Sequence, residues 1–146
     1  MRRYVTAFLV FLWGANYAGA EDIRILDGSY RTVAFAQKDG RLLDSSYRTL
    51  GYIQNDRVVD SSRRTLLIVN DDGVIRDSSY RVLARMDSEG RLRDGNYRTF
   101  GYVDVNGRVM DDSYRTVGYI NAINLRKQTV GLLLAYIFFF GAFAGK

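Results

Sequence analysis

Apolar and polar residues recur with a fixed period along most of the chain. The clearest column of aligned positions consists of Tyr30, Tyr47, Arg63, Tyr80, Tyr97 and Tyr114. Its spacing is 17 residues except for one step of 16, from Tyr47 to Arg63. A constant period of this length is typical of proteins that repeat one small structural unit. The pattern therefore predicts six copies of one unit.

Each unit predicts two short antiparallel strands joined by a tight turn. In the copy Arg41–Ile53, a short apolar arm ends at Asp44, and two small residues follow it. The longer arm is rich in aromatic and β-branched residues and has the length of one strand. The equivalent pairs Gly28-Ser29 and Gly95-Asn96 suit a two-residue hairpin turn, which we expect in every copy.

A second turn connects successive units, and in most copies it ends in glycine. The connections with this glycine are Lys38–Gly40, Asn70–Gly73, Asp87–Gly90 and Asp104–Gly107. They predict a type I turn closed by a residue with positive φ. The 16-residue step falls at Gln54–Asp56, where the glycine is missing. We expect this loop to absorb the deletion, because a slip within a strand would turn its side chains to the wrong face.

Alternation along the arms predicts two different faces. A two-residue turn would place Leu42, Asp44, Tyr47, Thr49, Gly51 and Ile53 on one face, and Leu43, Arg48, Leu50 and Tyr52 on the other. We expect the first face to be internal, since its only charge is the aspartate at the hairpin end. The second face carries an arginine in every copy, and Arg76, Arg85 and Arg93 add to it. This face should therefore meet water.

Twelve short strands leave two unpaired edges unless the last strand meets the first. The predicted fold class is thus an all-β repeat, in which six hairpins of about 17 residues close into a twelve-stranded barrel. Such a barrel is too wide for its own side chains to fill. One inward column is mostly small and makes the interior wider still: Ala34, Gly51, Leu67, Ala84, Gly101 and Gly118.

The C-terminal segment, residues 122–146, predicts a linker and an apolar helix. Its large side chains are Leu132, Leu133, Leu134, Phe138, Phe139, Phe140 and Phe143. We favour a helix inside the barrel, where these side chains would fill the space beside the small column. A membrane anchor is the alternative, because the uncharged stretch Gln128–Gly145 has 18 residues, the short limit of a span. A disordered tail is the third possibility.

The N-terminal segment has the layout of a secretory signal peptide. Arg2 and Arg3 precede the apolar run Val5–Trp13, and Ala18-Gly19-Ala20 offers small residues before a cleavage site. We expect a signal peptide at 1–20, the repeat domain at 21–121, and the linker and helix at 122–146. A retained N-terminal anchor is the alternative. The predicted location is the periplasm or cell envelope of a bacterium, with or without membrane association.

Composition narrows the chemistry. The 146 residues include no cysteine, histidine or proline, which excludes disulfides, thiolate chemistry and the commonest general base and zinc ligand. The formal charge of +5 is mild, so nucleic acid is not an expected partner. We predict no catalytic residues, no cofactor and no metal site.

Two charged columns run through the repeat. The aspartates are Asp27, Asp44, Asp60, Asp77, Asp94 and Asp111, and the arginines are Arg31, Arg48, Arg64, Arg81, Arg98 and Arg115. A ring of carboxylates could bind a cation, but aspartate at the start of a turn commonly accepts a backbone hydrogen bond from two residues on. The arginines could meet phospholipid head groups, but we expect each to lie beside an aspartate.

The repeats Arg41–Ile53 and Arg108–Ile120 resemble those of the bacterial β-flower proteins. The resemblance extends from Asp22 to about Asn121 and implies hairpin petals around a central axis. It implies no activity, because that family has none to transfer. Twelve strands around an apolar helix are also similar, at the level of fold alone, to the tubby and phospholipid-scramblase barrels.

The function expected from the sequence is a non-enzymatic binding or structural module, secreted or associated with the envelope and acting at a membrane surface. Its expected partner is membrane lipid or an envelope component, and nothing indicates an oligomeric state. One alternative is a periplasmic module displayed on a C-terminal membrane anchor. An enzyme that uses the aspartate and tyrosine columns is the last alternative.

Overall fold

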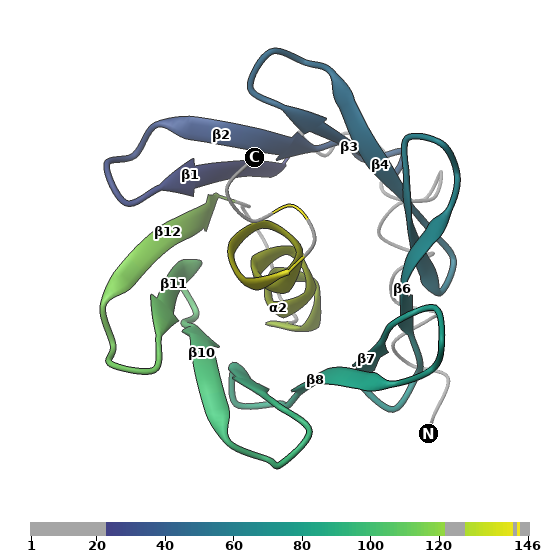
Figure 1. Cartoon of the computed structure of the whole chain (residues 1–146). Coiled ribbons are helices and arrows are strands. Elements are labelled where there is room, and N and C mark those ends of the chain that lie inside the picture. The colour runs from purple at the N-terminus through teal and green to yellow at the C-terminus, as the bar shows by residue number, and fades with distance from the viewer. Residues whose placement is uncertain (1–22, 122–127, 142, 144–146) are drawn as a thin grey trace.

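The computed structural model describes residues 23–121, 128–141 and 143, which form a closed antiparallel barrel with a short C-terminal helix (Figure 1). The strands are β1 (Ile23–Asp27), β2 (Thr32–Ala36), β3 (Arg41–Asp44), β4 (Thr49–Gln54), β5 (Arg57–Asp60), β6 (Thr65–Val69), β7 (Val74–Arg76), β8 (Val82–Met86), β9 (Arg91–Arg93), β10 (Thr99–Val103), β11 (Arg108–Asp111) and β12 (Thr116–Asn121). Each strand pairs with its neighbours in sequence, and β12 pairs with β1. The predicted twelve-stranded barrel is confirmed.

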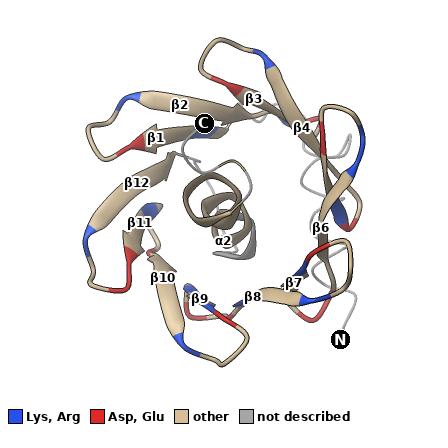
Figure 2. Ribbon diagram, in the orientation of Figure 1, with Lys and Arg blue, Asp and Glu red and all other residues tan. Residues whose placement is uncertain are grey.

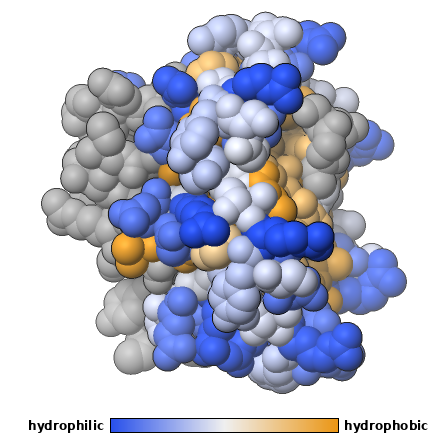
Figure 3. Space-filling view, turned by 90° about the vertical axis from the view of Figure 1, so that its left-hand side faces the viewer, coloured by the Kyte–Doolittle hydropathy of each residue, from blue (hydrophilic) through white to orange (hydrophobic). Residues whose placement is uncertain are grey.

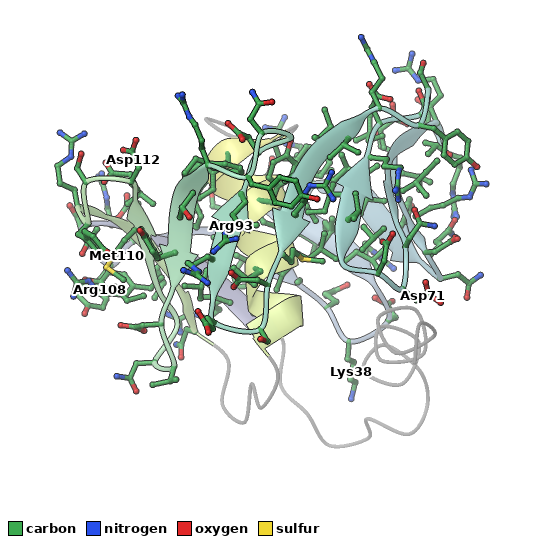
Figure 4. All side chains as sticks on the ribbon, turned by 90° about the horizontal axis from the view of Figure 1, so that it is seen from below. Lys38, Asp71, Arg93, Arg108, Met110 and Asp112 are labelled. Atoms are coloured by element: carbon green, nitrogen blue, oxygen red, sulfur yellow. The ribbon has the colours of Figure 1, made fainter. Side chains whose placement is uncertain are left out.

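The shortened connection leaves the strand register intact, as predicted. Gln54 pairs directly with Arg57 across the loop. Gly51 lies opposite Asp60, the same register that places Ala34 opposite Asp44. The predicted positive φ at the glycine-containing turns is also confirmed, at Gly40, Gly73, Gly90 and Gly107. These turns lie at one end of the barrel, and the turns that follow the column aspartates lie at the other. Figure 4 shows this in the positions of Lys38 and Asp71 at one end and Asp112 at the opposite end.

The prediction of a two-residue turn after each aspartate is wrong. The backbone N–H of Tyr47 donates to the carbonyl of Asp44, and the N–H of Asp44 donates to the carbonyl of Arg48. The loop therefore holds three residues, and Tyr47 closes it with φ of 67°. A left-handed backbone is unusual for a side chain as bulky as tyrosine. The six residues of this column all adopt it: Tyr30, Tyr47, Arg63, Tyr80, Tyr97 and Tyr114.

The extra loop residue changes which side chains point inward. Tyr47, expected inside, is 63% exposed. Thr49, also expected inside, pairs with Leu43 and therefore lies on the outer face. Leu50, expected outside, is half-buried and packs against the core, because Leu42 pairs with Gly51 while Leu43 pairs with Thr49. Leu50 is thus the extra residue of a β-bulge, which re-aims its side chain. The same bulge occurs in every copy, and the core-packed residues at this position are Val33, Leu50, Leu66, Leu83, Phe100 and Val117.

The C-terminal segment forms α2 (Gln128–Ala135) and a π-helical turn, η2 (Tyr136–Phe140). Figure 1, which looks along the barrel, places α2 within the outline of the ring of strands. Leu132, Leu133 and Leu134 are fully buried. A disordered tail is therefore wrong for these residues. None of the helices in the described part of the chain has the length and hydropathy of a membrane-spanning helix. The predicted signal peptide and the linker at 122–127 lie outside the described residues.

Candidate functional site

The aspartate column caps the turns at one end of the barrel. In the first copy, Oδ1 of Asp27 accepts hydrogen bonds from the backbone N–H groups of Ser29 at 2.8 Å and Arg31 at 3.0 Å. Its Oδ2 accepts one from Nε of Arg31 at 3.2 Å. The backbone bonds recur in all six copies, and the guanidinium bond recurs in every copy except that of Asp94. These carboxylates therefore hold the three-residue loop closed.

These hydrogen bonds stabilise the ionised carboxylates. The backbone N–H of the arginine four residues on is the largest cause that lowers the pKa of each column aspartate below its ordinary value of 3.8. Desolvation opposes this change, and the N–H two residues on and the arginine charge reinforce it. A carboxylate that is held ionised and already accepts several hydrogen bonds is a poor general acid or base near neutral pH.

The arginine column lies at the rim of the barrel, beside these aspartates. Figure 2 shows acidic and basic residues together on the turns that point away from the axis. The side chains of Arg31, Arg48, Arg64 and Arg81 are 80 to 81% exposed. Exposed pairs of this kind contribute about 0–1 kcal/mol each. The two predicted columns thus come together as turn caps.

The left-handed tyrosines connect neighbouring hairpins on the outer face. Tyr47 stacks on Phe35 of β2 with ring centroids 4.7 Å apart, and Tyr114 stacks on Tyr102 of β10 at 4.6 Å. Tyr30 stacks on Tyr119 at 4.2 Å, so the same contact also spans the junction between the first and last strands. Each of these three tyrosines therefore ties its own turn to the preceding hairpin. The alternation pattern did not predict this role, because it placed the tyrosines on the inner face.

Two copies replace this aromatic stack with an arginine–tyrosine contact. In one, the guanidinium of Arg63 lies 4.1 Å from the centre of the Tyr52 ring. In the other, the order is reversed, and the guanidinium of Arg85 lies 4.4 Å from the centre of the Tyr97 ring. Cation–π contact preserves the connection between hairpins in both cases. The copy with Arg63, which the sequence shows only as the loss of a tyrosine, therefore retains the contact.

Where one hairpin meets the next, two residues on the outer face lie opposite each other on paired strands. These residue pairs are apolar on one side of the barrel and basic on the other. Four pairs contain no charge: Phe35 with Leu43, Tyr52 with Val59, Tyr102 with Met110, and Tyr119 with Leu26. In the remaining two, Ile68 lies opposite Arg76, and Arg85 lies opposite Arg93. We call Arg76, Arg85 and Arg93 the arginine cluster. It breaks the symmetry of the repeat.

A groove of about 790 Å³ lies on the outer wall where β1 meets β12. Its lining includes Arg24, Tyr30, Arg108 and Tyr119. Arg108 is engaged within the wall, since its Nε donates to Oγ1 of Thr116 at 2.6 Å. Figure 3, which faces this side of the barrel, shows hydrophilic residues covering most of the surface, with smaller hydrophobic areas between them. The groove is open and mixed in character.

The predicted tail residues lie among the core. Phe138 and Phe143 are 7% exposed, and Phe139 and Phe140 are partly buried against the same cluster. Two of them face glycines of the small column: a Cβ built on Gly101 would lie 2.9 Å from the Phe140 ring, and one on Gly118 would lie 2.3 Å from the Phe139 ring. The predicted small column and the predicted large side chains therefore meet.

The family model described as the 5-fold β-flower protein matches residues 24–140. The chain belongs to this family. The match spans the barrel strands and most of the C-terminal helical segment, and it confirms the resemblance seen in the repeats. The comparisons with curated proteins and with solved structures gave no match. No metal-binding group of three or more acidic residues occurs in the described part of this β-flower chain.

Proposed function

We propose that this β-flower protein is an exported, non-enzymatic binding or structural module: a ring of six hairpin petals built around its own apolar C-terminal helix. The observation that carries the proposal is the fit between the small column and the tail. Gly101 and Gly118 leave room for Phe140 and Phe139, and Leu132, Leu133 and Leu134 have no exposed surface. A chain that fills its own lumen has its outer wall and rim left for partners.

The state of the charged columns supports a role other than catalysis. Each column aspartate serves its own turn, and its lowered pKa keeps it ionised. The column tyrosines serve contacts between petals. The repeated residues therefore have structural uses that do not depend on a substrate. The expected partner is membrane lipid or an envelope component that meets the wall from outside.

The six petals are proposed from the turns, since the family description is fivefold. The aspartate turn, with its left-handed residue, occurs at Asp27, Asp44, Asp60, Asp77, Asp94 and Asp111. Each such turn joins two consecutive strands of the twelve. Ring size in this chain would then be six, and the lumen would be wide enough for one helix and its aromatic side chains.

The internal position of the helix can be tested with a charge at Leu133, which is fully buried. Leu133→Asp should unfold the domain, because an unpaired carboxylate would enter the core. Val105→Asp is the matched control, since Val105 is 83% exposed. Circular dichroism and urea unfolding of both variants give the readout. Unfolding free energies within error of each other would overturn the internal helix and favour the membrane anchor.

Export can be tested on the full chain expressed in a bacterium. Mass spectrometry of the recovered protein should show Glu21 as the first residue, and osmotic shock should release the protein without detergent. Retention of Met1–Ala20, or recovery only with detergent, would overturn this part of the proposal. A turnover lost on changing Asp60 or Arg63 would overturn the non-enzymatic assignment.

A further inference from the structure

The arginine cluster occupies positions that are apolar in the other petals. Arg93 takes the place of Leu43, and Arg85 takes the place of Tyr52 and Tyr102. Arg85 and Arg93 lie directly opposite each other on paired strands, where like charges are destabilising. Arg76 is the diagonal neighbour of Arg85, since the residue opposite Arg85 is Val74, two positions before Arg76 on β7. Three guanidinium groups therefore share one region of the outer wall.

The carboxylates near the cluster are mostly engaged elsewhere. Asp87 accepts a 2.7 Å hydrogen bond from Nε of Arg91, and Nη2 of Arg91 donates to Glu89 at 2.6 Å. The distance from Asp87 to Nε of Arg93 is 3.7 Å, too long for a hydrogen bond. Arg76 bonds Asn70 and lies 3.7 Å from Asp72. These contacts leave Arg93 only partly compensated.

Arg85 has the least compensation of the three. Its guanidinium lies over the Tyr97 ring, and no ion pair to it occurs among the described residues. The Nε atoms of Arg85 and Arg93 are both buried and have no hydrogen-bond partner. Buried donors without partners are costly, and those of charged groups more so. Figure 4 places Arg93 on the outer face of the wall, midway between the two ends of the barrel.

We propose that the arginine cluster binds a phosphate group, with Arg85 and Arg93 as its principal ligands and Arg76 at its edge. A phosphate offers several acceptor oxygens to donors that approach from different directions, and arginine pairs with it through two parallel bonds. The bound anion would offset the repulsion between Arg85 and Arg93 and would compensate the charge of their guanidinium groups. The inference rests on the proposed binding role and names the chemistry that this wall would recognise. The phosphate could belong to a lipid head group or to a soluble compound.

The test uses inorganic phosphate and the purified full chain. The melting temperature is measured by circular dichroism as sodium phosphate replaces sodium chloride at constant ionic strength. We expect the melting temperature of the wild type to rise with phosphate. The double variant Arg85→Tyr plus Arg93→Leu has the side chains that occupy these two positions in other petals, so it should fold. Its affinity for phosphate should be lower than that of the wild type by roughly tenfold or more. Arg41→Gln is the control for loss of one outer arginine and should respond as the wild type does.

A measurement on the wild type alone keeps the test independent of folding. Phosphate should shift the Nε–Hε resonances of Arg85 and Arg93 in nuclear magnetic resonance spectra, while that of Arg41 stays in place. The proposal is overturned if these resonances do not move, or if the double variant keeps the phosphate response. Either failure would leave the export and internal-helix experiments unaffected, so the two proposals fail separately.

Vesicles distinguish the two sources of phosphate. If the ligand is a lipid head group, the wild type should sediment with phosphatidylglycerol vesicles but not with phosphatidylcholine vesicles, and the double variant should stay in solution. If the wild type responds to inorganic phosphate yet ignores both kinds of vesicle, the ligand is a soluble phosphate compound. Sedimentation of the wild type and double variant to the same extent would count against the cluster as the site.

Discussion

Replacing Gly118 by alanine should destabilise the barrel, because the added methyl group would collide with both a side chain and the backbone. The new Cβ would lie 2.3 Å from Cζ of Phe139 and 2.5 Å from the backbone carbonyl oxygen of Leu26. Both distances are far below ordinary van der Waals contact. The ring can turn aside, but the carbonyl belongs to β1, which is paired with β12 at this point. Overpacking of a well-filled core costs about 1–3 kcal/mol, and we expect Gly118→Ala to lie near the upper end.

The free energies come from urea unfolding followed by circular dichroism, with Gly95→Ala as the control. A Cβ on Gly95 would meet no atom within 4 Å, so this variant should unfold within about 0.5 kcal/mol of the wild type. Adding Phe139→Leu to Gly118→Ala should restore part of the loss, because it removes the ring but not the carbonyl. The reasoning is refuted if Gly118→Ala costs no more than Gly95→Ala, or if Phe139→Leu costs as much with alanine at position 118 as with glycine.

Three further predictions concern the turns. Tyr47→Gly should be more stable than Tyr47→Ala by about 1 kcal/mol in urea unfolding, the reverse of the usual order, because both lose the Phe35 stack but only glycine adopts a φ of 67° freely. Equal stabilities would contradict the left-handed turn. Arg63→Tyr should keep or raise the melting temperature, since a tyrosine ring can stack on Tyr52 as Tyr47 stacks on Phe35; a lower melting temperature would contradict this. The lowered pKa of Asp44 means that its contribution to stability is present above its ordinary value of 3.8 and is lost as pH falls through the lower folded-state value. Asp44→Asn should therefore flatten the fall in stability below about pH 4, and an unchanged acid profile would count against the cap.

The sequence predicts the barrel well because the period, the aspartates and the turn glycines all point to the same register. The loop length after Asp44 could not be predicted, because a left-handed position is normally occupied by glycine or asparagine and here it holds Tyr47. That one residue decides where the bulge falls, and the bulge turns Leu50 toward the core. The wrong turn type therefore places three columns on the wrong face, those of Tyr47, Thr49 and Leu50.

The candidate site was harder to predict than the fold. Arg85 and Arg93 are eight residues apart in the chain and face each other only through the pairing of β8 with β9. The alternation pattern predicts both on the outer face, in contact with water. The burial of their Nε atoms, and the contact of Arg85 with Tyr97, depend on side-chain packing that an alternation pattern does not contain.

The pairing of the first strand with the last has a consequence for the order of folding. Every other strand contact joins neighbours in the chain, so each hairpin can form as soon as it is made. The contact between Ile25 and Ile120 must wait for nearly the whole barrel sequence. Until then, the growing chain is an open ladder with an unprotected edge at each end, and such edges recruit other chains. The Tyr30–Tyr119 stack lies at this final junction, where it stabilises the closed ring once both edges have met.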